Sequence, residues 1–221
     1  MPNPARVGKP EADVTRRPLG QRRREHTRLD VVVVAHLDQV LSRARPLGRP
    51  DEPPAGLPEQ RADPKDIVQL KIRLDRYRPQ VWRRILIPAG ANLELLHHAI
   101  QVTFQWGGDH LHKFTVEETD YSHAGFELYN CLDERESALH AVLARPGSKI
   151  CYLYDFGDCW NHTITWEKTV ERDAGLRYPH CASGGGDYPI EYWDPDSDRK
   201  ADPFDRDALN VKLRCLTRMS R

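Results

Sequence analysis

The sequence contains no long hydrophobic run. Its longest uninterrupted apolar stretch extends only from Val31 to Ala35, whereas a membrane-spanning helix needs about 20 apolar residues. The chain does not open with the apolar segment that is typical of secretory signal peptides. We therefore expect no membrane partner.

Cysteine is scarce, and its spacing does not match the common zinc or redox motifs. The count of five is odd, and no two cysteines have the CxxC spacing. This pattern is typical of reduced thiols, so we expect a cytoplasmic location. The five residues are Cys131, Cys151, Cys159, Cys181 and Cys215.

The chain also lacks a net charge, with 33 basic and 33 acidic residues. The charges are unevenly spread, because residues 1–65 carry 13 Lys and Arg against 9 Asp and Glu, a net charge of +4. Residues 66–221 then carry −4, and a slightly acidic domain is a poor match for a nucleic-acid reader. Only the N-terminal segment, which includes Arg22–Arg24, is suited to weak, nonspecific contacts with nucleic acid.

Residues 1–65 are predicted to be a largely disordered leader. They hold ten of the 17 prolines and cannot bury enough apolar surface to offset the loss of chain entropy. Residues 29–44 differ, because their apolar side chains recur near helical spacing. Two interpretations of this short helix stay open: it packs on the domain or a partner, or it is marginal and has no role.

Residues 66–221 are predicted to form a single domain that begins with two strands. Apolar residues alternate with polar ones from Val68 to Leu74, which indicates a half-buried strand. A second strand is predicted over Val81–Ile87, with Arg83 on one face and Arg84 on the other. The short link through Arg78-Pro79 predicts a hairpin.

A helix is predicted to follow this hairpin, with Asn92 as its N-cap. Its apolar stripe is formed by Leu93, Leu96, His97, Ile100 and Phe104, and Gly107-Gly108 is predicted to end it. Further along, we expect a strand over 110–117, a short helix over 134–143, a hairpin of 149–154 with 160–168, a glycine-rich loop over 178–193 and a helix over 205–216 capped by Asp205.

These elements predict an α+β fold: a mixed, mainly antiparallel sheet of hairpins with helices packed against it. The side chains expected to be mostly buried come from both kinds of element. They are Trp82, Leu96, Ile100, Phe104, Phe114, Tyr154, Phe156, Trp160 and Ile164.

Four histidines are predicted to face the core. His97 lies on the apolar stripe of its helix, His110 and His112 share one face of a strand, and His162 shares a face with Trp160 and Ile164. Imidazole binds divalent metals and titrates near neutral pH. We expect at least three of six groups to line one pocket: His97, His110, His112, Asp155, Asp158 and His162.

Each motif also has a purely structural interpretation. Inward histidines are often hydrogen-bonded core residues, and Asp155 to Asp158 are typical of a turn in which Gly157 adopts a positive φ. Arg83 and Arg84 can hold an anion, although pairing with surface carboxylates is the preferred interpretation. Gly184–Gly186 are more typical of a flexible loop than of an anion-binding nest. Cys181 is more typical of a packing residue than of a nucleophile.

An ordered set of short motifs resembles the plasmid pRiA4b ORF-3-like family. The set covers residues 66–195, and it departs from the family after Cys181, where Gly184–Trp193 replace an acidic, proline-containing stretch with a second cysteine. The resemblance implies an association with mobile elements and no established activity. The motifs are Val81–Arg84 with Pro88, Leu96-His97 with Ile100-Gln101, Trp106, His110–Phe114, Tyr154–Asp158 with Trp160 and His162, and Tyr178-Pro179 with Cys181.

Three functions are compatible with these features. The leading hypothesis is a binding or interaction module, because the sequence spells no complete catalytic set. The second is a metal-dependent hydrolytic enzyme that uses the histidine and aspartate cluster with a divalent metal. The third is a nucleic-acid accessory protein that uses the basic leader.

The leader composition leads to a test. We expect a truncated chain that begins near Pro64 to keep a cooperative thermal transition, because residues 1–60 contribute little to a packed core. Circular dichroism during heating measures this. An insoluble or non-cooperative product would show that the predicted boundary is wrong.

Overall fold

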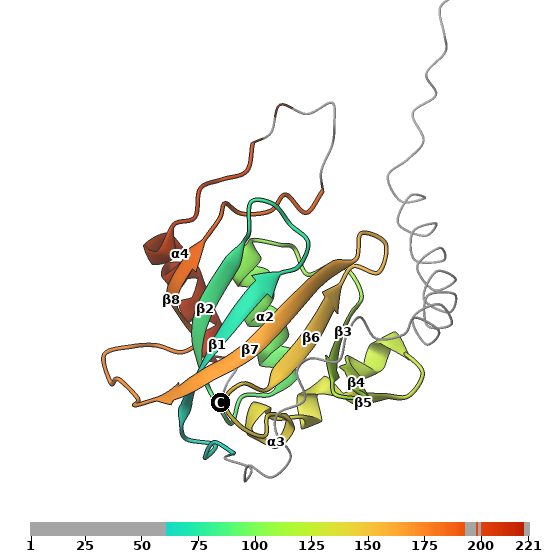
Figure 1. The fold of residues 1–221 in the computed structure, drawn as a ribbon, viewed down its shortest axis with the longest axis vertical. Coiled ribbons are helices and arrows are strands. Elements are labelled where there is room, and N and C mark those ends of the chain that lie inside the picture. Colours follow the sequence, from blue (N-terminus) through green and yellow to red (C-terminus); the bar gives the residue numbers. More distant parts are fainter. Residues whose placement is uncertain (1–60, 193–197, 199, 219–221) are drawn as a thin grey trace, which may run out of the picture. The chain divides into compact units, whose positions relative to one another are not determined.

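An eight-stranded sheet forms the framework of the described part of the chain (Figure 1). The computed structural model describes residues 61–192, 198 and 200–218, which belong to a unit that spans Pro46–Arg221. Most of the predicted leader, including the possible helix over 29–44, lies outside the described residues. No helix among the described residues is long and apolar enough to cross a membrane.

The sheet confirms the predicted fold class. The strand order is β5-β4-β3-β6-β7-β1-β2-β8, and all neighbours are antiparallel except β4 and β5, which are parallel. The strands are β1 (Ile67–Leu74), β2 (Trp82–Pro88), β3 (His112–Val116), β4 (Thr119–Ser122), β5 (Cys131–Asp133), β6 (Lys149–Tyr154), β7 (Trp160–Val170) and β8 (His180–Gly185).

Both predicted hairpins are present in this sheet. β1 pairs with β2, and β6 pairs with β7, each in antiparallel register. The alternation of side chains places Ile72 and Ile85 on the buried face, whereas Trp82 and Arg84 lie on the more exposed face of β2. The period-two pattern of the sequence therefore describes these strands correctly.

Helix α2 (Leu93–Phe104) lies across one face of the sheet (Figure 1). The side chain of Asn92 accepts a hydrogen bond from Leu95 N, so the predicted N-cap is confirmed. The helix ends earlier than Gly107-Gly108, because Gln105 adopts a left-handed conformation with φ 60° and its N–H donates to the carbonyl of Gln101.

The helix predicted over 134–143 is wrong as one element. The structure has a 3-10 helix η2 (Glu134–Glu136) and a short α3 (Leu139–Val142), in addition to η1 (Ala124–Phe126). The link between η2 and α3 is held in extended form by two backbone hydrogen bonds: Leu93 N donates to Ser137 O, and Leu139 N donates to Ala91 O. These tertiary bonds replace the intrahelical bonds that a continuous helix would make.

The glycine-rich loop predicted over 178–193 is also partly wrong, because His180–Gly185 form the edge strand β8. A Cβ atom at Gly184 would lie 2.7 Å from both Arg83 Cδ and Phe204 Cζ. A Cβ atom at Gly185 would lie 2.9 Å from Trp82 Nε1. The glycines are therefore strand residues whose side-chain space is occupied by neighbours.

The last helix is shorter than predicted. Helix α4 (Arg206–Leu213) is followed by the 3-10 helix η3 (Arg214–Arg218). Asp205 caps α4 as expected, since its carboxylate accepts hydrogen bonds from Asp207 N and Ala208 N. Helix α4 lies beside β8 at the edge of the sheet (Figure 1).

The predicted core is largely confirmed. Seven of the nine named side chains are buried, and only Trp82 and Trp160 are half-buried. Trp82 lies on the outer face of β2, where Arg84 and Lys71 approach its ring at 4.9 and 5.4 Å. Long cationic side chains, and not the core, cover this indole.

Phe104 joins α2 to the sheet, and its removal tests this packing. The side chain is fully buried, so we expect Phe104→Ala to lower the free energy of unfolding by about 3–5 kcal/mol. Val102→Ala, on a half-buried face of the same helix, should cost about 1 kcal/mol or less. Urea denaturation measures both changes. If both variants lost the same free energy of unfolding, Phe104 would not lie on the core-facing side of α2.

Candidate functional site

Two of the predicted histidines stack in the interior. His97 comes from α2 and His112 from β3, and their ring centroids lie 3.6 Å apart with an interplanar angle of 8°. Both side chains are buried. The helical stripe and the strand alternation both predicted these orientations, and the packing of α2 on the sheet brings the two rings together.

Hydrogen bonds connect these histidines to other buried polar groups. His97 Nδ1 lies within hydrogen-bond distance of the Tyr152 hydroxyl, at 2.8 Å. The same hydroxyl accepts a hydrogen bond from Gln101 Nε2 at 2.9 Å. His112 Nε2 lies 2.8 Å from Glu134 Oε2. Together with His162, these residues form what we call the inner cluster: His97, Gln101, His112, Glu134, Tyr152 and His162.

His162 completes the inner cluster from β7. Its Nδ1 lies 3.0 Å from the carbonyl of Trp160, and its ring packs edge-on against Phe104 and Trp106 at 4.9 and 5.3 Å. The Tyr152 ring lies 5.4 Å away. This histidine is therefore surrounded by aromatic side chains.

Burial keeps the imidazoles of His97 and His162 neutral. Burial, followed by the neighbouring imidazoles of His112, His98 and His123, lowers the pKa of His97 to about 2. Burial also lowers the pKa of His162 to about 3, and it raises the pKa of Tyr152 well above its usual value. Near neutral pH, His97 and His162 are therefore neutral groups, each with one ring nitrogen in a hydrogen bond.

His110 and Asp155 lie outside this cluster, at its rim. His110 precedes β3, so the prediction that it shares a face of that strand with His112 is wrong. Its Nε2 lies 3.0 Å from the Tyr192 hydroxyl and 3.6 Å from Asp155 Oδ2. The six predicted residues thus divide into three inner histidines, a rim pair, and Asp158, which is exposed.

The segment from Asp155 to Cys159 is a turn, as one interpretation of the sequence held. Asp155 Oδ1 accepts hydrogen bonds from Gly157 N at 2.9 Å and from Asp158 N at 3.4 Å. The positive φ angles belong to Asp155 and Cys159, at 54° and 55°, and not to Gly157. The turn points the second carboxylate oxygen of Asp155 at His110.

A cavity of about 220 Å³ lies next to this rim. Glu191 is a buried carboxylate in its wall: Oε2 accepts a hydrogen bond from Gly107 N at 2.7 Å, and Oε1 accepts one from the Tyr154 hydroxyl. None of the six predicted residues is among those that line the cavity. The lining residues are Gln105, Tyr188, Pro189, Ile190, Glu191, Tyr192, Lys200 and Asp202.

The sequence patterns missed Glu191 and Tyr192. They lie after β8 in a segment without periodicity, so no local signal marked them as site residues. Their positions are set by contacts with residues far away in the chain, Gly107 and Tyr154 for Glu191 and His110 for Tyr192.

The sequence also raised the hypotheses of a metal site and of a nucleophilic Cys181. Among the described residues, no three His, Cys, Asp or Glu side chains converge in a group that could hold a metal ion. Cys181 is a buried packing residue whose backbone N–H and carbonyl both bond to the side-chain amide of Asn210. Burial raises the pKa of its thiol to about 11.

The buried histidines predict a specific loss of stability in acid. An unfolded imidazole titrates near pH 6.5, so each buried neutral histidine takes up a proton on unfolding below that pH. Stability should fall by about 1.4 kcal/mol per pH unit for each such histidine as the pH drops below about 6.5. His162→Asn should remove one such contribution, as measured by urea denaturation at several pH values.

A second variant separates this effect from simple loss of packing. Ile164 is buried on the same strand, and Ile164→Val should lower stability by about 0.5–1.5 kcal/mol at every pH. Its pH slope should match that of the unaltered protein. A His162→Asn slope that also matches would contradict the assignment of a neutral, buried His162.

Comparison with known proteins places this domain in a family. A crystal structure titled protein of unknown function MM3350, from Methanosarcina mazei Go1, is 29% identical with a TM-score of 0.51, and the match covers 54% of this chain and 70% of that one. The uncharacterized protein y4hQ of Sinorhizobium fredii (strain NBRC 101917 / NGR234) is 34% identical over 127 residues, 57% of this chain. The match covers 65% of y4hQ, slightly less than two thirds of its length.

The family model described as plasmid pRiA4b ORF-3-like protein matches residues 66–194. The matched region begins just before β1 and extends past Glu191 and Tyr192, so it includes the whole sheet, the inner cluster and the rim. The match covers more than half of the chain and agrees with the resemblance of the sequence motifs. The protein belongs to the plasmid pRiA4b ORF-3-like family.

Proposed function

We propose that this domain is a binding module that holds a cationic group, such as an ammonium or guanidinium, in the cavity beside Glu191. The observation that carries the proposal is the buried carboxylate of Glu191 in the cavity wall. In this proposal five of the six predicted residues act in two ways. The inner histidines support the site, while the rim residues His110 and Asp155 shape its entrance beside Tyr192.

The charges around the cavity favour a cation. Glu191 and Asp202 line it, and Lys200 is the cationic side chain in the lining. The pKa of Tyr192 is raised, first by burial and then by the negative charges of Glu191, Asp109 and Asp155. Among the described residues, four carboxylates (Glu191, Asp202, Asp109 and Asp155) against the one ammonium group of Lys200 make this region negative, which attracts cations and repels anions.

Glu191 is already ordered for binding. Each of its carboxylate oxygens accepts one hydrogen bond from the protein, and each oxygen can accept a second one. A ligand N–H could therefore bind without displacing Gly107 or Tyr154. Because the carboxylate is held in place before binding, its side-chain entropy is not lost when the ligand arrives.

Tyr192 supplies an aromatic surface beside the carboxylate. It is 56% exposed, and its hydroxyl is held by His110. An exposed aromatic ring next to a carboxylate is suited to an alkylammonium or guanidinium group, because the ring face attracts the cation while the carboxylate accepts its N–H groups.

The inner cluster supports this site through Tyr154. The Tyr154 ring stacks on Trp106 at 5.3 Å and lies 6.5 Å from His97. Its hydroxyl then donates to Glu191. Rigid packing around Tyr154 therefore holds the Glu191 carboxylate in a single position.

The proposal is tested by calorimetric titration with N-acetyl-lysine amide and N-acetyl-arginine amide. N-acetyl-norleucine amide, which lacks the charge, serves as the control ligand. We expect the cationic ligands to bind and Glu191→Gln to weaken them about tenfold or more, because one charge-assisted hydrogen bond contributes roughly 1.5–3 kcal/mol. Glutamine preserves the shape of the side chain and one acceptor.

Glu136→Gln is the matched control variant. Glu136 is exposed and lies on η2, away from the residues that line the cavity, so this change removes the same charge without altering the site. Its affinity should remain within about twofold of the unaltered protein. A cation site at Glu191 would be refuted if N-acetyl-norleucine amide bound as tightly as the cationic ligands. It would also be refuted if Glu191→Gln and Glu136→Gln weakened binding equally.

A further inference from the structure

Arg83 is a fully buried arginine whose hydrogen-bonding capacity is only partly used. It lies on the inner face of β2 and has 0% of its surface exposed. Its Nη1 donates to the carbonyls of Trp82 and Gly185, at 2.9 and 2.7 Å. Within the described part of the chain, Nε and Nη2 have no hydrogen-bond partner. The preferred sequence hypothesis, a surface pair with a carboxylate, is therefore wrong for Arg83.

The two nitrogens of Arg83 that have no hydrogen-bond partner among the described residues, Nε and Nη2, form the edge with which other arginines of this protein bind carboxylates. Arg84 donates from Nε and Nη2 to the two oxygens of Glu167, at 2.7 and 3.0 Å. Arg135 donates from the same two nitrogens to Asp133. The planar Nε/Nη2 edge matches the two oxygens of an oxyanion, and this match makes such pairs strong.

Aromatic rings surround the Arg83 guanidinium without supplying oxygen acceptors. The guanidinium carbon lies 4.1 Å from the Phe204 ring centroid, 5.0 Å from Tyr188 and 5.7 Å from Phe104. These rings stabilise the cation through their faces. Burial lowers the pKa of Arg83 to about 10, so the group is still charged near neutral pH. A buried charge with two unbonded nitrogens is costly unless an acceptor satisfies it.

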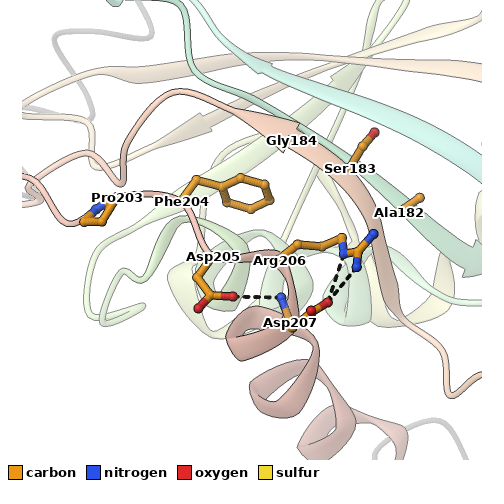
Figure 2. A pocket seen from close by; sticks show the side chains of 8 residues that line it. All are labelled: Ala182, Ser183, Gly184, Pro203, Phe204, Asp205, Arg206 and Asp207. Carbon is orange, nitrogen blue, oxygen red and sulfur yellow. Dashed lines mark hydrogen bonds and ion pairs between the residues drawn. The ribbon is translucent and has the colours of Figure 1, made fainter.

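A cavity of about 580 Å³ is lined by Phe204 and Gly184 (Figure 2). The Phe204 ring also packs on the Arg83 guanidinium, and Gly184 is the register partner of Arg83 on β8. A Cβ atom at residue 184 would lie 2.7 Å from Arg83 Cδ, so glycine is what allows the cavity wall to lie against the arginine. Phe204 is half-buried and separates the cavity from the guanidinium face.

The arginine and the helix N-terminus at this cavity already have partners. Arg206 donates to Asp207, and the first N–H groups of α4 donate to Asp205 (Figure 2). Asp205 and Asp207 outnumber Arg206 in the cavity lining, so the cavity mouth carries a net charge of −1. Two carboxylates at the entrance disfavour a doubly charged phosphate more than a singly charged carboxylate.

We propose that Arg83 is the anchor of a second binding site, in which a small carboxylate enters through the 580 Å³ cavity and bonds to Nε and Nη2. Rotation of the Phe204 ring, which fills the space beside Gly184 together with Arg83, opens the path. The site differs in position and in ligand charge from the cation site at Glu191. A chain-terminal carboxylate and a free carboxylic acid present the same chemistry to this edge.

The test uses the full chain labelled with ¹⁵N-arginine and follows the Nε–H signals by nuclear magnetic resonance. The probes are sodium acetate and sodium N-acetylglycinate, the second of which resembles a chain terminus, with sodium chloride and sodium phosphate at matched ionic strength. We expect a saturable shift of the Arg83 Nε–H signal with the carboxylates. Chloride should cause no saturable shift, and phosphate should bind at least several-fold more weakly than acetate because of Asp205 and Asp207.

Two variants identify the responsible group. Arg83→Lys keeps the charge but loses the planar edge, and should weaken acetate binding about tenfold or more. Arg84→Lys changes the neighbouring arginine, which already holds Glu167, and should leave the affinity within about twofold. Glu191→Gln should also leave it unchanged, which separates this site from the proposed cation site.

The proposal is overturned if chloride reproduces the shift, if the Arg83 signal does not respond to carboxylate, or if Arg83→Lys binds acetate as the unaltered protein does. If Arg83→Lys does not fold, the titration of the unaltered protein decides, because the Arg83 Nε–H signal can be assigned through its side-chain correlations. Preferential binding of N-acetylglycinate over acetate would identify a chain terminus as the class of ligand. Equal binding would identify a free acid.

Discussion

The packing of α2 on the sheet requires polar groups to be buried together, and the rest of the structure depends on how they are satisfied. The Tyr152 hydroxyl is central, because it bonds to both His97 and Gln101 of the helix. A third hydrogen bond joins His112 of β3 to Glu134 of η2. These bonds link the helix, the sheet and the segment over 131–143, and leaving one of them unmade in the interior would cost roughly 1–3 kcal/mol.

The position of the proposed cation site depends on this buried framework. Trp106 and Tyr154 extend the aromatic packing from the inner cluster, and the Tyr154 hydroxyl donates to the buried carboxylate of Glu191. The glycines of the edge strand β8 allow Arg83 and Trp82 to occupy the space where side chains of β8 would otherwise lie. Both proposed sites thus depend on contacts between side chains that are distant in the sequence.

Local patterns in the sequence were sufficient for the elements with strong periodicity. Alternation identified β1, β2, β6 and β7, and Asn92 marked the start of α2. The same periodicity placed His97, His112 and His162 on inward faces. It failed for β8, because glycine gives no apolar signal and is typical of loops. It also failed for the segment over 134–143, where distant backbone bonds from residues 91–93 prevail over helical propensity.

By itself, the sequence determined which faces of the regular elements are apolar, where α2 and α4 begin, and that His97, His112 and His162 point inward, since these features depend on side chains only a few residues apart. Only the tertiary structure decided which groups meet. Glu191 receives its hydrogen bonds from residues 107 and 154, and Arg83 lies among rings from residues 104, 188 and 204. Contacts between residues so far apart in the chain depend on strand order and helix placement, which no local period encodes.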